Sequence, residues 1–180
     1  GDCIPRKDFV SIHLKNKEVN YFLSGGYFKL PMDVSKAITD NDIETQNCFN
    51  VSWLKKQGLN LNFKATKLTH NRCFAAFMNW LTPTKRTFNG HNTSWIKKDI
   101  LAVNGFNEDM QYGGLDREVG ERMFNNDLFS KQIRYSAICI HLDHSRGYYS
   151  QEGWNKNLAI RAFNKKNGVV KIKNGIEKLP

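Results

Sequence analysis

Two neighbouring segments with different hydrophobic periods set the fold class of this chain. Residues 133–141 alternate apolar and polar side chains, which predicts a β-strand. Residues 152–166 carry Trp154, Leu158, Arg161 and Ala162 at helical spacing, which predicts an amphipathic helix with this stripe facing inward. A strand followed so closely by a long helix, in a chain with few hairpin signals, favours an α/β or α+β fold.

The rest of the chain adds shorter elements. Helices are predicted near residues 5–14, with Phe9, Ile12 and His13 on one stripe, and near residues 97–103 and 116–126, the last with Val119, Met123 and Phe124 facing inward. Extended pieces are predicted within residues 21–30, where a Gly pair interrupts them, and within residues 90–95, while residues 72–80 read as a buried helical or extended segment.

Length and composition favour one folded domain over residues 1–180. A chain of 180 residues with 40% hydrophobic and 12% aromatic residues has enough apolar side chains for a sizeable core, which excludes a disordered protein. No apolar run approaches 18 residues, so no membrane-spanning helix is predicted. The four cysteines are scattered without a CxxC pair, which favours reduced thiols and a cytoplasmic location, although two disulfides are also compatible with this count.

The charge is basic. Lys and Arg number 27 against 17 Asp and Glu, a net charge of +10, which points to an anionic partner: a nucleic acid, a membrane surface or an acidic substrate. Half of the excess positive charge lies in the last 30 residues, which contain two Glu and seven basic residues: Lys156, Arg161, Lys165, Lys166, Lys171, Lys173 and Lys178. This segment is either a solvated helix face with a tail or a surface that attracts acidic lipid head groups or an anionic polymer.

A Gly pair precedes the first candidate for chemistry. Gly113 and Gly114 allow a sharp turn or a close approach to a ligand, and Asp116 follows where a helix is predicted to begin. One interpretation makes Asp116 the N-cap of that helix. The other makes it a general base for a substrate hydroxyl, a role that full engagement as a cap would weaken.

Two further segments carry polar side chains suited to ligands. His141 and His144 follow the predicted strand, and imidazole can bind Mn or Zn, although such histidines are also often structural. Residues 89–95 place Asn92 and Trp95 close together, and amides beside a flat aromatic face suit a sugar; an ordinary polar turn is the alternative.

Five motifs, in this order, resemble the inverting GT-A glycosyltransferases of family 2 type and the C-terminal module of galactosyltransferases. They cover about residues 1–144. They are Gly1-Asp2-Cys3, Gly90-His91-Asn92-Thr93-Ser94-Trp95, Val103-Asn104-Gly105-Phe106-Asn107-Glu108, Gly113-Gly114-Leu115-Asp116-Arg117-Glu118 and His141-Leu142-Asp143-His144.

The resemblance implies a fold and a domain organisation. The fold would be the C-terminal part of a GT-A domain, a mixed sheet flanked by helices, with a family-like core at 1–145 and a basic helix and tail at 146–180. Family members carry a nucleotide-binding half before the DxD motif, so the chain looks like the acceptor and metal half of such an enzyme. This half alone is expected to be inactive.

The resemblance also implies roles for single residues. Asp2 matches the last Asp of the DxD motif, and with His144, and less directly His141, it would hold a divalent Mn or Mg ion. Asp116 matches the catalytic base. The substrate-binding residues would be Asn92, Trp95, Tyr112, Gly113, Gly114 and Arg117.

Two positions depart from the family pattern. The family has a Trp before the Gly pair, where this chain has Gln111-Tyr112, so Tyr112 is expected to supply the aromatic face. The Glu that precedes the catalytic Asp in the family is Leu115 here, which removes one carboxylate from the neighbourhood of the substrates.

The resemblance therefore implies a bacterial enzyme of cell-surface polysaccharide synthesis. It would transfer a sugar, with inversion, from a nucleotide-diphosphate donor to a glycan or lipid-linked acceptor. It would act in the cytoplasm, with peripheral contact to the inner membrane face through the basic C-terminus and without nucleic acid. The alternatives are a non-catalytic carbohydrate-binding module and, ranked third, a basic nucleic-acid-binding domain, whose binding would depend steeply on salt.

Overall fold

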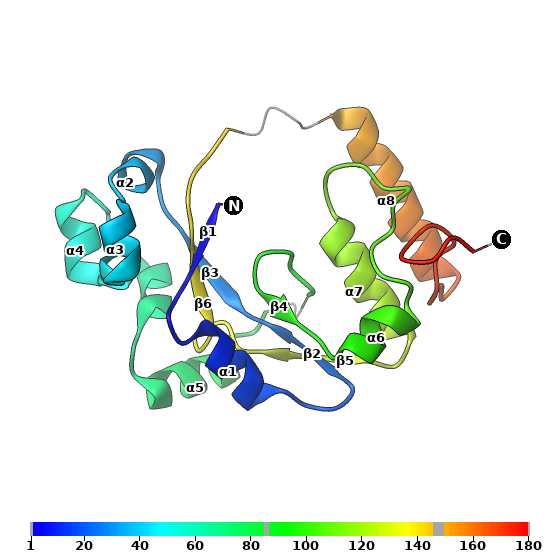
Figure 1. Cartoon of the computed structure of the whole chain (residues 1–180), viewed down its shortest axis with the longest axis horizontal. Helices are drawn as coiled ribbons and strands as arrows, with labels where there is room; N and C mark the ends of the chain where they lie inside the picture. The colour runs from blue at the N-terminus through cyan, green and yellow to red at the C-terminus, as the bar shows by residue number, and fades with distance from the viewer. Residues whose placement is uncertain (1, 85–86, 146–149, 180) are drawn as a thin grey trace. The chain divides into compact units, whose positions relative to one another are not determined.

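The computed structural model describes residues 2–84, 87–145 and 150–179, which form two compact units (Figure 1). Unit 1 contains residues 2–16, 25–84 and 132–145, and unit 2 contains residues 17–24, 87–131 and 150–179. Each unit draws on three separate stretches of the sequence, so residues far apart along the chain meet within each unit. The prediction of one domain with a boundary near residue 145 stays a prediction.

A three-stranded mixed sheet organises unit 1. Its strands are β1 (Cys3–Pro5), β6 (Ile138–His141) and β3 (Gly26–Lys29), with β6 in the middle (Figure 1). β6 pairs antiparallel with β1 and parallel with β3. Gly26 is required at the start of β3, because a Cβ there would overlap the backbone carbonyl of Arg134. The sheet brings the N-terminal residues of the chain beside residues near position 141.

Short helices complete unit 1. They are α1 (Phe9–Asn16), α2 (Met32–Lys36), α3 (Asp40–Glu44), α4 (Val51–Lys56) and α5 (Arg72–Leu81), with 3₁₀ turns η1 (Asn47–Phe49) and η2 (Phe63–Leu68). Asn side chains begin three of these segments: Asn50, Asn62 and Asn71 each accept a hydrogen bond from a backbone N–H of the following turn. The main core joins sheet and helix residues, among them Ile4, Phe28, Leu54, Leu68, Ile138 and Ile140.

Unit 2 is built around two helices that lie side by side, α7 (Leu115–Asn125) and α8 (Gln151–Lys166) (Figure 1). It also contains α6 (Lys97–Ala102) and a small sheet. The strands of this sheet follow in the order β4 (Thr93–Ser94), β2 (Tyr21–Ser24) and β5 (Phe129–Gln132). Gln132, the last residue of β5, belongs to unit 1. Its core contains Phe22, Phe88, Ile100, Val103, Val119, Met123 and Leu128.

These elements match the α/β class expected from the sequence. The helices at 97–102, 115–125 and 151–166 are confirmed, as is the interruption between the two extended pieces within residues 21–30. The first helix begins only at Phe9, because Pro5 is the last residue of β1, but its stripe of Phe9, Ile12 and His13 does face inward. None of the helices in the described ranges has the length and apolar character needed to cross a lipid bilayer.

The predicted strand over residues 133–141 is wrong in its first half. Residues 133–137 form a turn in which the backbone N–H of Ala137 donates to the carbonyl of Ile133 (2.8 Å), and β6 begins only at Ile138. Ile133, Tyr135 and Ala137 are nevertheless buried, so alternate burial in a turn produced the pattern of a strand.

The predicted inward stripe of α8 is also wrong. Leu158 and Ala162 are exposed, whereas Gly153, Asn157 and Asn164 form the buried side of the helix. The two asparagines are buried because each makes hydrogen bonds to α7 or to the loop before it.

Candidate metal centre and the Asp116 loop

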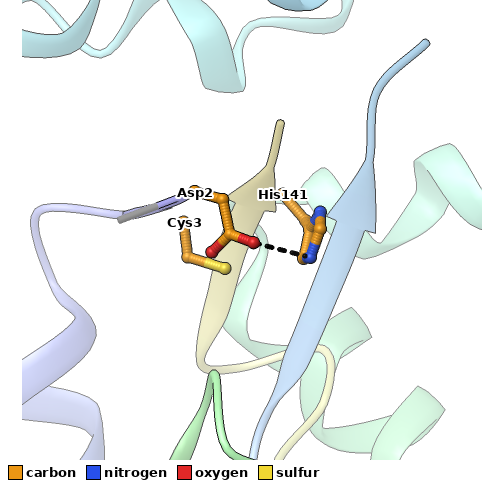
Figure 2. Close-up of side chains that lie close together, drawn as sticks. All are labelled: Asp2, Cys3 and His141. Carbon is orange, nitrogen blue, oxygen red and sulfur yellow. Dashed lines mark ion pairs between the residues drawn. The ribbon is translucent and has the colours of Figure 1, made fainter. Parts of the chain in front are cut away.

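The ends of β1 and β6 bring Asp2 to two histidines. Cys3 pairs with His141 in the antiparallel ladder, and the backbone N–H of Leu142 donates to the carbonyl of Asp2 (2.8 Å). The Asp2 carboxylate oxygen Oδ2 lies 3.0 Å from Nε2 of His144 and 3.4 Å from Nε2 of His141 (Figure 2 draws the Asp2–His141 pair). The three residues that the resemblance assigned to a metal therefore meet in unit 1; Gly1, from the same motif, lies outside the described residues.

The two histidine rings have the same orientation toward Asp2. Nδ1 of His141 lies 2.8 Å from the carbonyl of Leu142, and Nδ1 of His144 lies 2.9 Å from the carbonyl of Ser145. A carbonyl only accepts, so both Nδ1 atoms carry the proton, and a neutral ring then has its lone pair on Nε2. Both Nε2 atoms face the carboxylate, so a cation or an added proton is needed between them. Backbone bonds that fix the ring in this way are typical of metal-binding histidines.

The carboxyl group of Asp2 is ionised at neutral pH. Partial burial raises the pKa of Asp2, but a hydrogen bond from Cys3, a backbone hydrogen bond and the charges of His141 and His144 lower it more, so that its pKa lies below the usual value. A hydrogen bond with Cys139, together with burial, raises the pKa of the Cys3 thiol, which therefore stays protonated. The carboxylate and the imidazoles are the groups ready to bind a metal.

The Asp2 carboxylate lies at a ligand-like distance from each histidine. Adjacent ligands on an octahedral ion with bonds near 2.1 Å lie about 3 Å apart, and the two Asp2–His separations are 3.0 and 3.4 Å. Among the described residues, the set of three whose ligand atoms all lie within 4.8 Å of one another is Asp2, Cys3 and His141, which does not include His144. One carboxylate and two imidazoles suit Mn²⁺. Cys3 Sγ also lies within 4.8 Å of the ligand atoms of Asp2 and His141 (Figure 2), but its protonated thiol is not a metal ligand. Such a ligand set leaves coordination positions for substrate oxygens.

A neighbouring carboxylate has a different role. Asp143 lies between the two histidines in sequence but pairs with Lys29 on β3 (2.9 Å), and the hydrogen bond from Lys29 keeps its pKa low. This pair could not be predicted from the sequence, because Lys29 and Asp143 are far apart along the chain.

Asp116 lies in the first turn of α7 and is not its N-cap. The N-cap position belongs to Gly114, whose φ of 78° is left-handed, and the preceding Gly113 has a φ of 107°. The interpretation of Asp116 as the cap is therefore wrong. Its Oδ1 accepts from the backbone N–H of Arg117 (2.8 Å) and its Oδ2 from that of Gly90 (3.1 Å), so the carboxylate is held in place while its side chain stays partly exposed.

The hydrogen bond from Gly90 joins two of the predicted substrate segments within unit 2. It holds the turn at residues 89–92 against Asp116. Asn92 is buried, and its backbone N–H donates to Oδ1 of Asn89 (2.9 Å), which gives it a structural part in this turn. Trp95 is partly exposed, and its ring packs on Phe88 with centroids 5.0 Å apart. The extended structure predicted for residues 90–95 is limited to β4.

Asn157 of α8 holds the loop that carries Tyr112 and the Gly pair. Its Nδ2 donates to the carbonyls of Gln111 (2.9 Å), Tyr112 (3.3 Å) and Gly113 (2.7 Å), and its Oδ1 accepts from the N–H of Gln111 (3.0 Å). Tyr112 itself is exposed, as is Arg117. The sequence did not single out Asn157, because its partners lie more than 40 residues away.

Replacing Asn157 with Ala is expected to destabilise the protein by about 1–3 kcal/mol, because the N–H of Gln111 and three carbonyls lose a buried partner. Thermal or urea unfolding measures this loss. Asn155→Ala is the matched control, since Asn155 lies on the exposed side of the same helix. Equal stability of the two variants would contradict the role given to Asn157.

The predicted site residues thus form two groups. Asp2, His141 and His144 meet in unit 1, while Asp116, Gly113 and Gly114 lie with Asn92, Trp95, Tyr112 and Arg117 in unit 2. No protein-family model, curated protein or solved structure matches the chain.

Proposed function

We propose that this chain is the metal and acceptor half of an inverting glycosyltransferase of GT-A type. The enzyme transfers a sugar from a nucleotide-diphosphate donor to a glycan or lipid-linked acceptor, in the cytoplasm, as a step of cell-surface polysaccharide synthesis. The observation that carries the proposal is the meeting of Asp2 with His141 and His144, at 3.4 and 3.0 Å, from opposite ends of unit 1 in sequence.

The first task of the site is to hold the donor diphosphate. A Mn or Mg ion, when bound, would neutralise charge on the leaving diphosphate. Asp2 and His144 would hold the ion, with His141 beside them, and the backbone bonds at both Nδ1 atoms keep Nε2 available. The Lys29–Asp143 pair fixes the segment between the two histidines.

The second task is to accept a proton from the acceptor hydroxyl. Asp116 would take this proton as the hydroxyl oxygen attacks the anomeric carbon and the diphosphate leaves, a single displacement that inverts the centre. Backbone N–H donors from Gly90 and Arg117 orient the carboxylate. Tyr112 and Trp95 would offer ring faces to a sugar, and Gly113 and Gly114, both with positive φ, form the turn that follows Tyr112.

The test is metal-dependent turnover by the enzyme that carries the implied nucleotide-binding half. A panel of uridine and guanosine diphosphate sugars is offered with mixed glycan acceptors, and release of nucleoside diphosphate is measured. We expect release with at least one donor, loss on chelation, and recovery on addition of Mn²⁺. Turnover that persists after chelation, or no turnover with the whole panel, would contradict the proposal.

Sugar binding without catalysis is the second candidate, favoured by the exposed rings of Trp95 and Tyr112 in unit 2. Under this alternative the chain would bind glycans equally well with and without metal and would release no nucleoside diphosphate. The same assay therefore separates the two functions.

A further inference from the structure

Helix α5 has larger apolar side chains on its outward side than on its buried side. The buried side consists of Ala75 and Met78, which pack with Tyr135. The outward side presents Phe74, Phe77, Trp80 and Leu81, and Trp80 is 80% and Phe77 51% exposed. We call these four residues the α5 face. The prediction that residues 72–80 are buried is therefore wrong for this side of the helix.

An exposed aromatic face of this kind needs an explanation. Single exposed apolar residues are ordinary, but four on one ten-residue helix form a contiguous patch of the type that marks an interaction site. The rings of Phe77 and Trp80 lie 6.0 Å apart, so they form one surface. Trp and Phe are also the side chains that bind most readily at the boundary between lipid and water.

All charged residues near α5 along the sequence are basic. No Asp or Glu occurs between Glu44 and Asp99, whereas Lys64, Lys67 and Arg72 lie in η2 and at the start of α5. Lys67 is half-buried with its Nζ 5.8 Å from the centroid of the Tyr27 ring, and burial, then repulsion from Arg134 and Lys64, lowers its pKa. Phe63, beside Lys64, is 68% exposed and adds another aromatic ring to this basic stretch.

We propose that the α5 face, with the basic residues Lys64, Lys67 and Arg72, docks the protein on the surface of a membrane containing anionic phospholipids. The aromatic rings enter the interfacial region and the cations attract the acidic head groups. A helix of ten residues is too short to span the bilayer, so the contact is peripheral. This inference does not depend on the proposed glycosyltransferase activity.

The experiment is co-sedimentation of the chain with vesicles. Vesicles of equal phosphatidylglycerol and phosphatidylcholine are compared with pure phosphatidylcholine, and we expect binding to the anionic vesicles with a blue shift of tryptophan emission. The double variant Phe77→Ala, Trp80→Ala should lose about tenfold or more in partitioning. Lys64→Gln and Lys67→Gln should each lose about fivefold.

Two control variants separate this surface from others. Phe163→Ala removes a ring that is 63% exposed on α8 in unit 2, and it should bind as the unchanged protein does. Lys165→Gln, Lys166→Gln removes two cations from the basic C-terminal helix. The proposal would be overturned by absence of vesicle binding, by an equal loss in these controls, or by self-association through the α5 face without vesicle binding, which would assign that face to a second copy of the chain.

Discussion

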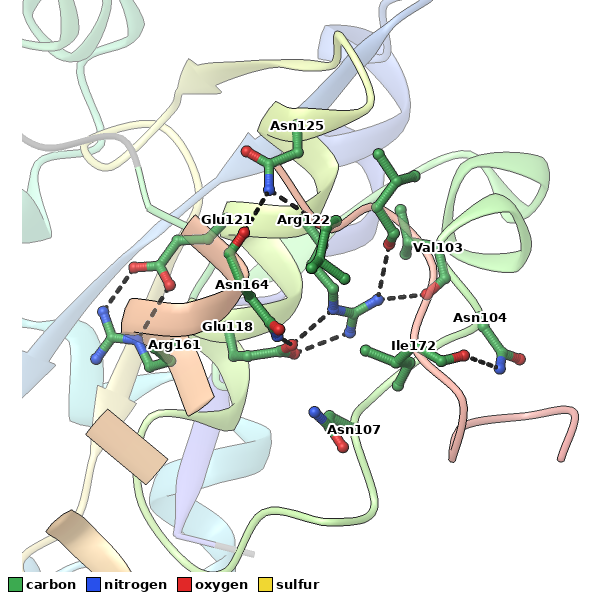
Figure 3. Close-up of polar contacts among 12 residues, drawn as sticks. Val103, Asn104, Asn107, Glu118, Glu121, Arg122, Asn125, Arg161, Asn164 and Ile172 are labelled. Carbon is green, nitrogen blue, oxygen red and sulfur yellow. Dashed lines mark hydrogen bonds and ion pairs between the residues drawn. The ribbon is translucent and has the colours of Figure 1, made fainter. Parts of the chain in front are cut away.

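Arg122→Met is expected to destabilise the protein by about 3–5 kcal/mol, because it leaves the carboxylate of Glu118 buried without its partner. Both side chains are fully buried in unit 2. Arg122 Nε donates to Glu118 Oε1 (2.7 Å) and Nη2 to Oε2 (2.9 Å) (Figure 3). Nη2 also donates to the carbonyl of Gly105 (2.6 Å). A third donor, Nη1, reaches the carbonyl of Val103. The guanidinium thus joins α7 to the end of α6.

The matched control is Arg161→Met. Arg161 makes a similar two-bond pair with Glu121 (2.6 and 3.1 Å, Figure 3), but the two side chains are partly exposed. An ion pair open to water contributes about 1 kcal/mol or less. Urea unfolding of both variants measures the difference. Equal losses would contradict the importance given to burial, whereas partial recovery in the double variant Glu118→Leu, Arg122→Met would support it.

Asp116→Asn is expected to lower the rate of sugar transfer about 10²- to 10⁴-fold, the range that a positioned general base contributes. The amide oxygen of Asn can keep a bond from Gly90 or Arg117 but cannot accept the proton of the acceptor hydroxyl. Donor binding should remain unchanged, since Asp116 is not assigned to the diphosphate. The measurement is kcat together with donor affinity in the enzyme that turns over.

Asp127→Asn serves as the control, because Asp127 lies just after α7 with a φ of 56°, a conformation that Asn tolerates well. This variant should keep full activity. Full activity in Asp116→Asn would remove Asp116 from the catalytic role and would leave the metal centre without a partner base in the proposed reaction.

The sequence predicted the local elements better than their packing. Helices with apolar residues at regular spacing, such as α7 with Val119 and Met123, formed as expected because their burial follows from their own period. Phe124 of the same helix, also expected to face inward, is 42% exposed. The α8 stripe was wrong because Asn157 and Asn164 are buried by partners 44–46 residues distant, Asn157 against the loop at 111–113 and Asn164 against Glu118. Periodicity contains no information on such hydrogen bonds.

The candidate site was likewise predicted in part: the motifs were found, but their tertiary contacts were not. The order of the motifs predicted that Asp2, His141 and His144 belong together, and antiparallel pairing of β1 with β6 brings them together. The Lys29–Asp143 pair and the bond from Gly90 to Asp116 depend on tertiary structure and could not be predicted from neighbouring residues. Membrane contact through the basic C-terminus stays a prediction; Lys171 and Lys178 in this segment pair with Glu177 and Glu108.

Titration of the chain with Mn²⁺, followed by the electron paramagnetic resonance signal of the free ion, tests the metal centre most directly. We expect one saturable Mn²⁺ site per chain. Its affinity should fall about tenfold or more in Asp2→Asn and in His144→Gln, because removing a ligand should cost at least as much as removing the hydrogen-bond partner behind a ligand. Asp143→Asn, whose carboxylate pairs with Lys29, should keep the site. Absence of a saturable site, or the same Mn²⁺ affinity in the unchanged protein and all three variants, would contradict a metal site at Asp2 and His144.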